Sequence, residues 1–302
     1  MSFSRRDFIR AGLVVGAGSV LGRRALAGES KNILAAVEGS DPEKMVRRAF
    51  ELLGGVKKFV APGSRVVVKP NASFANPADW GNNTDPRVAT AVCRMVMEAG
   101  ARKVSVVDYP LMRGAEALEI NGMAAACKAA SIPVSVLGKQ SQFRKVKIPR
   151  GKVLKEVEIS REVLDADMLI NLPVAKAHDA VAASIGLKNL MGVIWDRAAF
   201  HTMMEINQAI ADLSLAVRPQ LTLVDMLRVM TTNGPKGPGE IESPNLVVAC
   251  ADPVAADAFC LSQVRFNGRK FKPKQLKYLR FAAEAGLGEI NAKQLKILRE
   301  KV

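Results

Sequence analysis

The densest group of side chains that could do chemistry lies between residues 172 and 201, a stretch that contains both histidines of the 302-residue chain. Lysine and arginine neutralise a carboxylate or phosphate, an asparagine amide orients it, and a histidine transfers a proton near neutral pH. We therefore predict a small-anion site in this stretch. The catalytic candidates are His178, His201 and Lys188, and the ligand-binding candidates are Lys176, Asn189 and Arg197. The histidines could also hold a metal, although their spacing matches no standard ligand motif.

Polar residues also follow the short apolar runs that read as strands. The candidates at these strand ends are Lys69, Asn71, Asp225 and Asp252. Ligands of open parallel sheets bind beyond the carboxyl ends of the strands, so residues placed there can contact one. Asparagine and aspartate are also common turn formers, which is the alternative for any single position. Their recurrence at several strand ends favours a ligand site.

A glycine- and proline-rich loop, NGPKGPG, spans residues 233–239 and contains Lys236. Glycine removes the side-chain obstacle to a close approach between backbone and ligand. The loop does not match a phosphate-binding Walker motif. It is either a surface turn or a ligand contact in which Lys236 faces an anion.

The elements that must position these residues follow an alternating pattern of apolar runs and amphipathic stretches, which is typical of an α/β fold. We predict a mostly parallel, Rossmann-like sheet with flanking helices. The predicted strands lie near residues 32–37, 65–69, 103–108, 134–137, 167–171, 221–225 and 246–250. The predicted helices lie near residues 41–53, 86–99, 115–130, 180–190, 203–217, 254–264, 273–285 and 292–301. Two basic alternating segments, 144–148 and 155–159, predict a small antiparallel insertion.

The N-terminal 27 residues have the three parts of an export signal. Arg5 and Arg6 form a consecutive arginine pair, residues 11–22 form a short apolar run, and Ala25-Leu26-Ala27 supplies a small-x-small cleavage site. This pattern predicts a twin-arginine signal peptide, passage through the twin-arginine translocase and a periplasmic or otherwise exported mature protein. The alternative is a basic amphipathic helix at the start of a cytosolic domain.

The chain is basic, with a formal net charge of +15 that falls to +11 if the first 27 residues, with five arginines and one aspartate, are removed. Basic residues cluster at 144–155 and 265–277. With two tyrosines and two tryptophans in the chain, little aromatic surface is present for stacking bases, so we expect no nucleic-acid partner. We interpret both clusters as solvated faces, or otherwise as contacts to anionic lipid or an acidic partner.

The four cysteines are Cys93, Cys127, Cys250 and Cys260, and no two form the closely spaced pair typical of zinc or iron–sulfur sites. No iron–sulfur cluster is therefore expected within this chain. Each cysteine lies among apolar residues, which favours small buried side chains. Cys250 with Cys260 is the one disulfide pairing that we would test.

Several motifs in order resemble the domain of unknown function 362 family over nearly the whole of residues 28–302. These motifs are VVVKPN at 66–71, TDP at 84–86, NLPVAKAH at 171–178, GLKNLMGVI at 186–194, Arg197 with His201, RPQLTLVD at 218–225, NGPKG at 233–237 and ADPVAAD at 251–257. The resemblance adds Asp257 to the ligand-binding candidates. It implies one domain, or two α/β lobes with a seam near residues 138–152.

The resemblance implies less about activity than about fold. Many relatives carry an attached four-iron ferredoxin-like segment, which implies redox chemistry nearby, and this chain has no such cysteine cluster. A weaker similarity, to the nickel-pincer lactate racemase group, rests on domain order and on His178 preceding the turn at Gly186–Lys188. Two functions stay open: an exported enzyme acting on a small anionic substrate, and a noncatalytic partner subunit of an exported redox complex. The cofactor, if any, is unknown.

Overall fold

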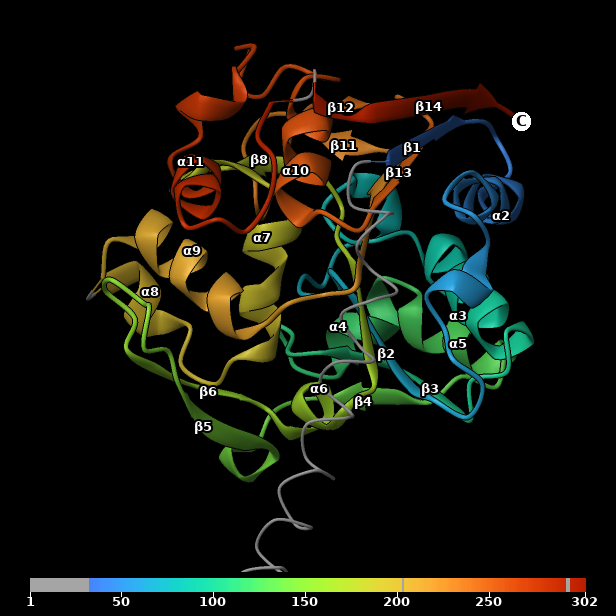
Figure 1. The fold of residues 1–302 in the computed structure, drawn as a ribbon, viewed down its shortest axis with the longest axis horizontal. Coiled ribbons are helices and arrows are strands. Elements are labelled where there is room, and N and C mark those ends of the chain that lie inside the picture. Colours follow the sequence, from blue (N-terminus) through green and yellow to red (C-terminus); the bar gives the residue numbers. More distant parts are fainter. Residues whose placement is uncertain (1–32, 203, 292–293) are drawn as a thin grey trace, which may run out of the picture.

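The computed structural model describes residues 33–202, 204–291 and 294–302, so the predicted signal segment 1–27 lies outside the described residues (Figure 1). Its centre is an eight-stranded sheet. In spatial order the strands are β14 (Lys296–Lys301), β1 (Ile33–Glu38), β13 (Leu246–Cys250), β10 (Leu221–Met226), β7 (Met168–Leu172), β2 (Arg65–Pro70), β3 (Lys103–Asp108) and β4 (Val134–Val136).

Most neighbouring strands of this sheet are parallel. The five strands from β10 to β4 form one parallel block, and β14 pairs in parallel with β1. Among the described strands of the sheet, β13 is the one that runs opposite to both of its neighbours. The predicted α/β class with a mostly parallel sheet is therefore confirmed.

Helices cover both faces of the sheet, because its strands are apolar on both sides. On β13, Val247 and Ala249 join the hydrophobic core on one face, whereas Leu246 and Val248 join the core on the other. The helices of the first core are α2 (Pro42–Leu52), α3 (Pro86–Glu98) and α5 (Met123–Ala129). Those of the second core are α7 (Gly186–Asn189), α9 (Ile206–Ala216), α10 (Pro253–Leu261) and α11 (Lys277–Glu284). Figure 1 shows α2, α3 and α5 gathered on one side of the sheet, with α7, α9 and α11 on the other.

Three of these helices begin with the same dipeptide, aspartate followed by proline. Asp41, Asp85 and Asp252 are the N-caps of α2, α3 and α10, and each side chain accepts backbone N–H groups of the first turn. Proline at the first helical position lacks an N–H that would otherwise be unpaired there. These local signals explain why the helix starts were predictable from the sequence.

The predicted antiparallel insertion is confirmed as the hairpin of β5 (Phe143–Lys147) and β6 (Glu156–Ser160). Its basic side chains are partly neutralised, since Lys145 pairs with Glu156 at 2.8 Å.

The remaining elements are the strands β8 (Lys176–His178), β9 (Ala182–Ser184), β11 (Val229–Met230) and β12 (Ile241–Glu242), the helices α4 (Glu116–Ile120), α6 (Arg161–Asp165) and α8 (Ala198–Thr202), and the 3₁₀ helices η1 (Val56–Lys58), η2 (Ala78–Trp80), η3 (Gln140–Gln142), η4 (Leu190–Val193) and η5 (Pro273–Gln275).

Two helix predictions are wrong. The segment 180–185 is not helical, because β9 pairs with β8 and Ala182 adopts a φ of 67°, which no right-handed helix contains; the helix α7 starts only at Gly186. Residues 296–301 form β14, because their backbone groups pair with the otherwise open edge of β1. The helix predicted near 115–130 is divided into α4 and α5 at Gly122, whose φ is 81°.

The cysteines lie in the cores. Cys93, Cys127 and Cys260 are free thiols, so the Cys250–Cys260 disulfide does not form. Burial raises the pKa of Cys127 to about 11 and that of Cys250 to about 12. Among the described residues, none of the helices combines the length and the apolar character needed to span a bilayer.

Candidate functional site

A cavity of about 860 Å³ opens beyond the carboxyl ends of β2 and β3, where the parallel strands were expected to present a ligand site. Its volume suits a small organic ligand. The predicted site residues that line it are Asn71, Lys176, His178, Lys188, Asn189, Arg197, His201 and Lys236. We call this cavity the anion pocket, after the cations that it contains.

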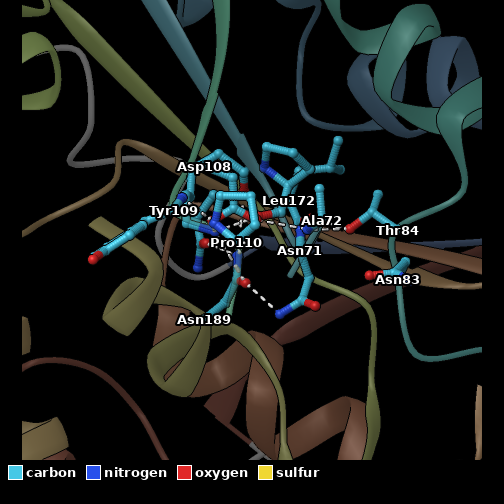
Figure 2. A network of polar contacts seen from close by, with 12 residues as sticks. Asn71, Ala72, Asn83, Thr84, Asp108, Tyr109, Pro110, Leu172 and Asn189 are labelled. Atoms are coloured by element: carbon cyan, nitrogen blue, oxygen red, sulfur yellow. Dashed lines mark hydrogen bonds and ion pairs between the residues drawn. The ribbon is translucent and has the colours of Figure 1, made fainter. Parts of the chain in front are cut away.

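The floor of the anion pocket is a network of amide side chains (Figure 2). Asn71 follows β2, and its Nδ2 donates to Oδ1 of Asn189 at 3.0 Å. Asn189 lies at the end of α7, and its Nδ2 donates to Oδ1 of Asn171 on β7 at 2.8 Å. The backbone N–H of Asn71 donates to the hydroxyl of Thr84 at 2.8 Å, and this hydroxyl donates to the carbonyl of Leu172. The network ties the ends of β2 and β7 to α7 and fixes the floor.

Lys176, on β8, is the most buried cation of the pocket, with 1% of its surface exposed. Its ammonium donates to Oδ1 of Asn71 at 2.8 Å and to the carbonyl of Asn82 at 2.5 Å, and lies 4.4 Å from the ring centroid of Phe74. It makes no ion pair within the described residues. Burial, followed by the charge of Lys188, lowers the pKa of Lys176 well below its usual value.

Lys188, on α7, is also buried, with 9% of its surface exposed. In the part of the chain that the structure describes, its ammonium has neither a hydrogen bond nor an ion pair. Burial and then the positive charge of Arg197 lower the pKa of Lys188 to about 8. A fraction of this side chain is therefore an uncharged amine near neutral pH.

The two histidines lie side by side, with ring centroids 6.3 Å apart and planes inclined by 6°. His178 is buried, and burial together with Lys188 and Lys176 lowers its pKa to about 2, so its ring is neutral. Its Nδ1 lies 2.9 Å from the Asp179 carboxylate and accepts the N–H of Ala180. His201, on α8, is exposed, and partial burial lowers its pKa as well. Two neutral imidazoles thus face the pocket, and each can accept and donate a proton.

Arg197 is held against an aromatic cluster. Its guanidinium lies 4.1 Å from the ring centroid of Tyr109 and donates to the carbonyls of Tyr109, at 2.6 Å, and Pro110, at 3.2 Å. Tyr109 stacks in parallel with Trp195, and Phe143 contacts both rings. The remaining N–H groups of Arg197 stay available to an anion. Burial lowers the pKa of this guanidinium but leaves it charged.

Lys69, a predicted ligand contact, lies beneath the floor rather than in the lining. Its ammonium pairs with Oδ1 of Asp108 at 2.8 Å, and both side chains are fully buried. A Cβ added to Gly192 would lie 2.5 Å from Oδ1 of Asp108 and 2.7 Å from Nζ of Lys69. Glycine at position 192 therefore lets the chain that lines the pocket pass directly over this ion pair.

The loop at 233–239 borders the pocket, and Lys236 lines it while staying exposed. The carbonyl of Lys236 accepts Nδ2 of Asn76 at 2.9 Å. A Cβ on Gly234 would lie 2.0 Å from the carbonyl oxygen of Ala177, so this glycine permits close packing against β8. The loop is thereby fixed beside the strand that carries Lys176.

Three further predicted contacts, Asp225, Asp252 and Asp257, also lie outside the pocket and accept backbone N–H groups instead. Asp225 accepts the N–H groups of Asp85 and Leu227, and burial raises its pKa to about 7. Asp252 caps α10 and borders a second cavity of about 400 Å³.

Asp257 positions the helix that carries two pocket residues. Its carboxylate accepts the N–H groups of Gly186, at 2.7 Å, and Leu187, at 3.0 Å, which are the first residues of α7. Burial raises the pKa of Asp257 to about 7. This contact fixes the start of the short helix on which Lys188 and Asn189 lie.

The sequence prediction missed the aromatic wall, above all Tyr109 and Trp195, as well as the partner of Lys69. Asp108 is the last residue of β3 and Tyr109 follows it, so the strand-end criterion applies to both as it does to Asn71. Trp195 follows no predicted strand, and it is far from Tyr109 in the sequence. Their stacking therefore could not be predicted from the sequence. Within the described ranges, no three histidine, cysteine, aspartate or glutamate side chains are grouped so as to hold a metal ion.

Comparison with known proteins places the chain in a family. It is 30% identical over 221 residues to a thylakoid-associated protein of Synechocystis sp., covering 70% of this chain and 66% of that relative's length. The lactate racemase apoprotein of Thermoanaerobacterium thermosaccharolyticum superposes with a TM-score of 0.48 at 14% identity, covering 78% of this chain and 58% of that one. Residues 66–262 match the family described as Domain of unknown function (DUF362). The chain therefore belongs to the DUF362 family.

Proposed function

We propose that this protein is an exported enzyme that binds a small carboxylate- or phosphate-bearing molecule in the anion pocket. The observation that carries the proposal is the convergence of Lys176, Lys188 and Arg197 on one cavity, where none of the three makes an ion pair within the described residues. Taking a cation out of water is costly unless an opposite charge accompanies it. A bound anion would supply that charge.

The amide floor supports the same proposal. Asn71 holds Lys176 through a 2.8 Å hydrogen bond, and Asn189 holds Asn71. The ammonium is therefore fixed before any ligand binds, which reduces the entropy cost of binding. A carboxylate or phosphate that binds between Lys176 and Arg197 would accept hydrogen bonds from two donors whose positions are already fixed.

Proton transfer on the bound molecule is the reaction class that the histidines support. His201 is the better acid or base of the two, because it is exposed and its pKa is depressed less by burial than that of His178. His178 then serves as the neutral neighbour against which His201 stacks. Replacing His201 by alanine should lower turnover by roughly a hundredfold or more, whereas binding of the anion persists.

Export through the twin-arginine route is part of the proposal and rests on residues 1–27 alone. Replacing Arg5 and Arg6 by lysine should retain the precursor in the cytoplasm, and the matched control Arg23→Lys and Arg24→Lys should not. Export of the Arg5/Arg6 variant at the wild-type level would contradict this part.

Native mass spectrometry of the protein purified from the exported fraction tests the function. The proposal predicts a bound carboxylate or phosphate compound that is lost in Lys176→Met and kept in the surface control Lys145→Met. A protein that is empty, takes up no such compound and co-purifies with a redox protein would contradict it. That result would instead favour a noncatalytic partner subunit.

A further inference from the structure

The three cations Lys176, Lys188 and Arg197 of the anion pocket are held in different ways. Lys176 has two hydrogen bonds and a ring contact, and Arg197 has two hydrogen bonds and a ring contact. Lys188 is buried, with 9% of the residue exposed, and it lines the cavity. Its ammonium nevertheless has no hydrogen bond or ion pair among the described residues. The first two are built as fixed anion contacts, whereas the amine of Lys188 stays free to react.

We infer that Lys188 is a nucleophile that forms an imine with the carbonyl carbon of a 2-oxo acid or an aldehyde acid, whose carboxylate is bound by Lys176 and Arg197. This inference rests on the proposed function, because it uses the same pocket and the same anion contacts. It narrows the ligand class to anions that carry a ketone or aldehyde next to the acid group.

The surroundings of Lys188 favour the uncharged amine that such a reaction needs. Burial and the charge of Arg197 lower its pKa to about 8, and desolvation beside another cation is the usual means of activating a lysine nucleophile. Asp257 holds the first turn of α7 by two hydrogen bonds, so Lys188 projects from a fixed backbone. Its position is therefore defined, although its ammonium has no partner.

The step balances without any oxidant or reductant. The nitrogen lone pair of Lys188 attacks the carbonyl carbon, and the carbonyl oxygen takes up a proton to give a carbinolamine. The nitrogen gives up two protons in all, the hydroxyl oxygen takes up a second proton, the C–O bond breaks, and the oxygen leaves as water while the C=N bond forms. His201, which lines the same pocket, can carry these protons between nitrogen and oxygen.

Borohydride trapping tests the inference on the purified mature protein with glyoxylate and pyruvate as probes. Reduction of the imine leaves a secondary amine, so the mass of the protein increases by that of the probe minus one oxygen atom. Peptide mapping should place this adduct on Lys188, with roughly tenfold or more adduct than on the exposed Lys128 of α5 at pH 7.5. Inorganic phosphate should protect Lys188 by competing for the pocket and should leave Lys128 unchanged.

The variant Lys188→Arg keeps the cation and removes the primary amine. It should retain phosphate binding and lose the adduct at position 188. Adduct spread evenly over exposed lysines, or unaffected by phosphate, overturns the inference. Binding of glyoxylate without any adduct on Lys188 overturns it while leaving the proposed function intact. Absence of both adduct and binding of any carboxylate or phosphate to the folded wild type contradicts the inference and the proposed function together.

Discussion

The ammonium of Lys69 lies 2.8 Å from the carboxylate of Asp108 directly beneath Gly192, so a fully buried ion pair supports the floor of the anion pocket. Asp108 also accepts the backbone N–H groups of Ala72, two residues after the end of β2, and of Tyr109, the first residue after β3. One side chain thereby connects two strand ends. The pocket residues that follow those strands are positioned by this buried contact.

Replacing Lys69 by methionine should destabilise the fold by about 3–5 kcal/mol, because it leaves the Asp108 carboxylate buried without its counter-charge. Urea denaturation followed by circular dichroism measures this loss. The double variant Lys69→Met/Asp108→Asn also removes the unpaired carboxylate charge and should recover part of the stability. A single variant that costs under about 1 kcal/mol would show that the pair is not a supporting contact.

Replacing Gly192 by alanine should cost about 1–3 kcal/mol, since the added methyl overlaps with Lys69 and Asp108. Binding of inorganic phosphate should weaken as well, because the segment that lines the pocket must move. Gly138→Ala is the matched control, as a Cβ there meets no atom within 4 Å. Equal melting temperatures for the two variants would contradict the close approach at position 192.

The affinity for an anion should depend on pH through Lys188. Its pKa of about 8 in the empty protein means that the ammonium is present below this pH and lost above it. Binding of an anion favours the protonated form, so affinity should fall by up to about tenfold per pH unit above pH 8. Phosphate changes its own charge around its second pKa near neutral pH, whereas acetate keeps one charge throughout this range. The measurement is therefore a titration with acetate between pH 7 and 10. In Lys188→Arg the decrease assigned to this group should disappear, and a profile identical to that of the wild type would refute the assignment.

Stability should rise as the pH is lowered from about 7 toward 4, through Asp225 and Asp257. Burial raises the pKa of both carboxyls to about 7 from the ordinary aspartate value of 3.8. Between these values the folded state keeps protons that the unfolded state releases, so this contribution is complete below about pH 4 and is lost as the pH rises through 7. Urea midpoints at pH 5 and 7.5 measure it. Asp257→Asn should reduce the difference between the two midpoints, and an unchanged difference would exclude Asp257 as a source.

The sequence predicted the parts of the fold that depend on local signals. Aspartate followed by proline marked the starts of α2, α3 and α10, and apolar runs marked the strands of the sheet. It failed for β14, whose residues pair with β1 across more than 250 positions of the chain, and for β9, whose hairpin depends on a left-handed Ala182. Such pairings depend on tertiary neighbours rather than on local propensity.

For the site, the strand-end criterion and the clustering of residues 172–201 located seven of the lining residues, and the glycine- and proline-rich loop added Lys236. These criteria could not distinguish a side chain that contacts a ligand from one that accepts hydrogen bonds from backbone N–H groups. Asp257 and Asp225 are polar and buried like Lys176, but their partners are N–H groups of distant segments. Which role a buried polar side chain takes is decided by the elements packed against it.

The most direct test of the account is a calorimetric titration of the wild-type protein and Lys176→Met with inorganic phosphate and with acetate, at low salt and pH 7. We predict that the wild type binds at least one of the two anions and takes up protons as it does so. Affinity should be at least about tenfold weaker in Lys176→Met, since a fixed charged donor is lost, and unchanged in Lys145→Met. A folded wild type that binds neither anion would contradict the claim that Lys176, Lys188 and Arg197 form an anion site. Equal binding by the wild type and Lys176→Met would contradict it as well.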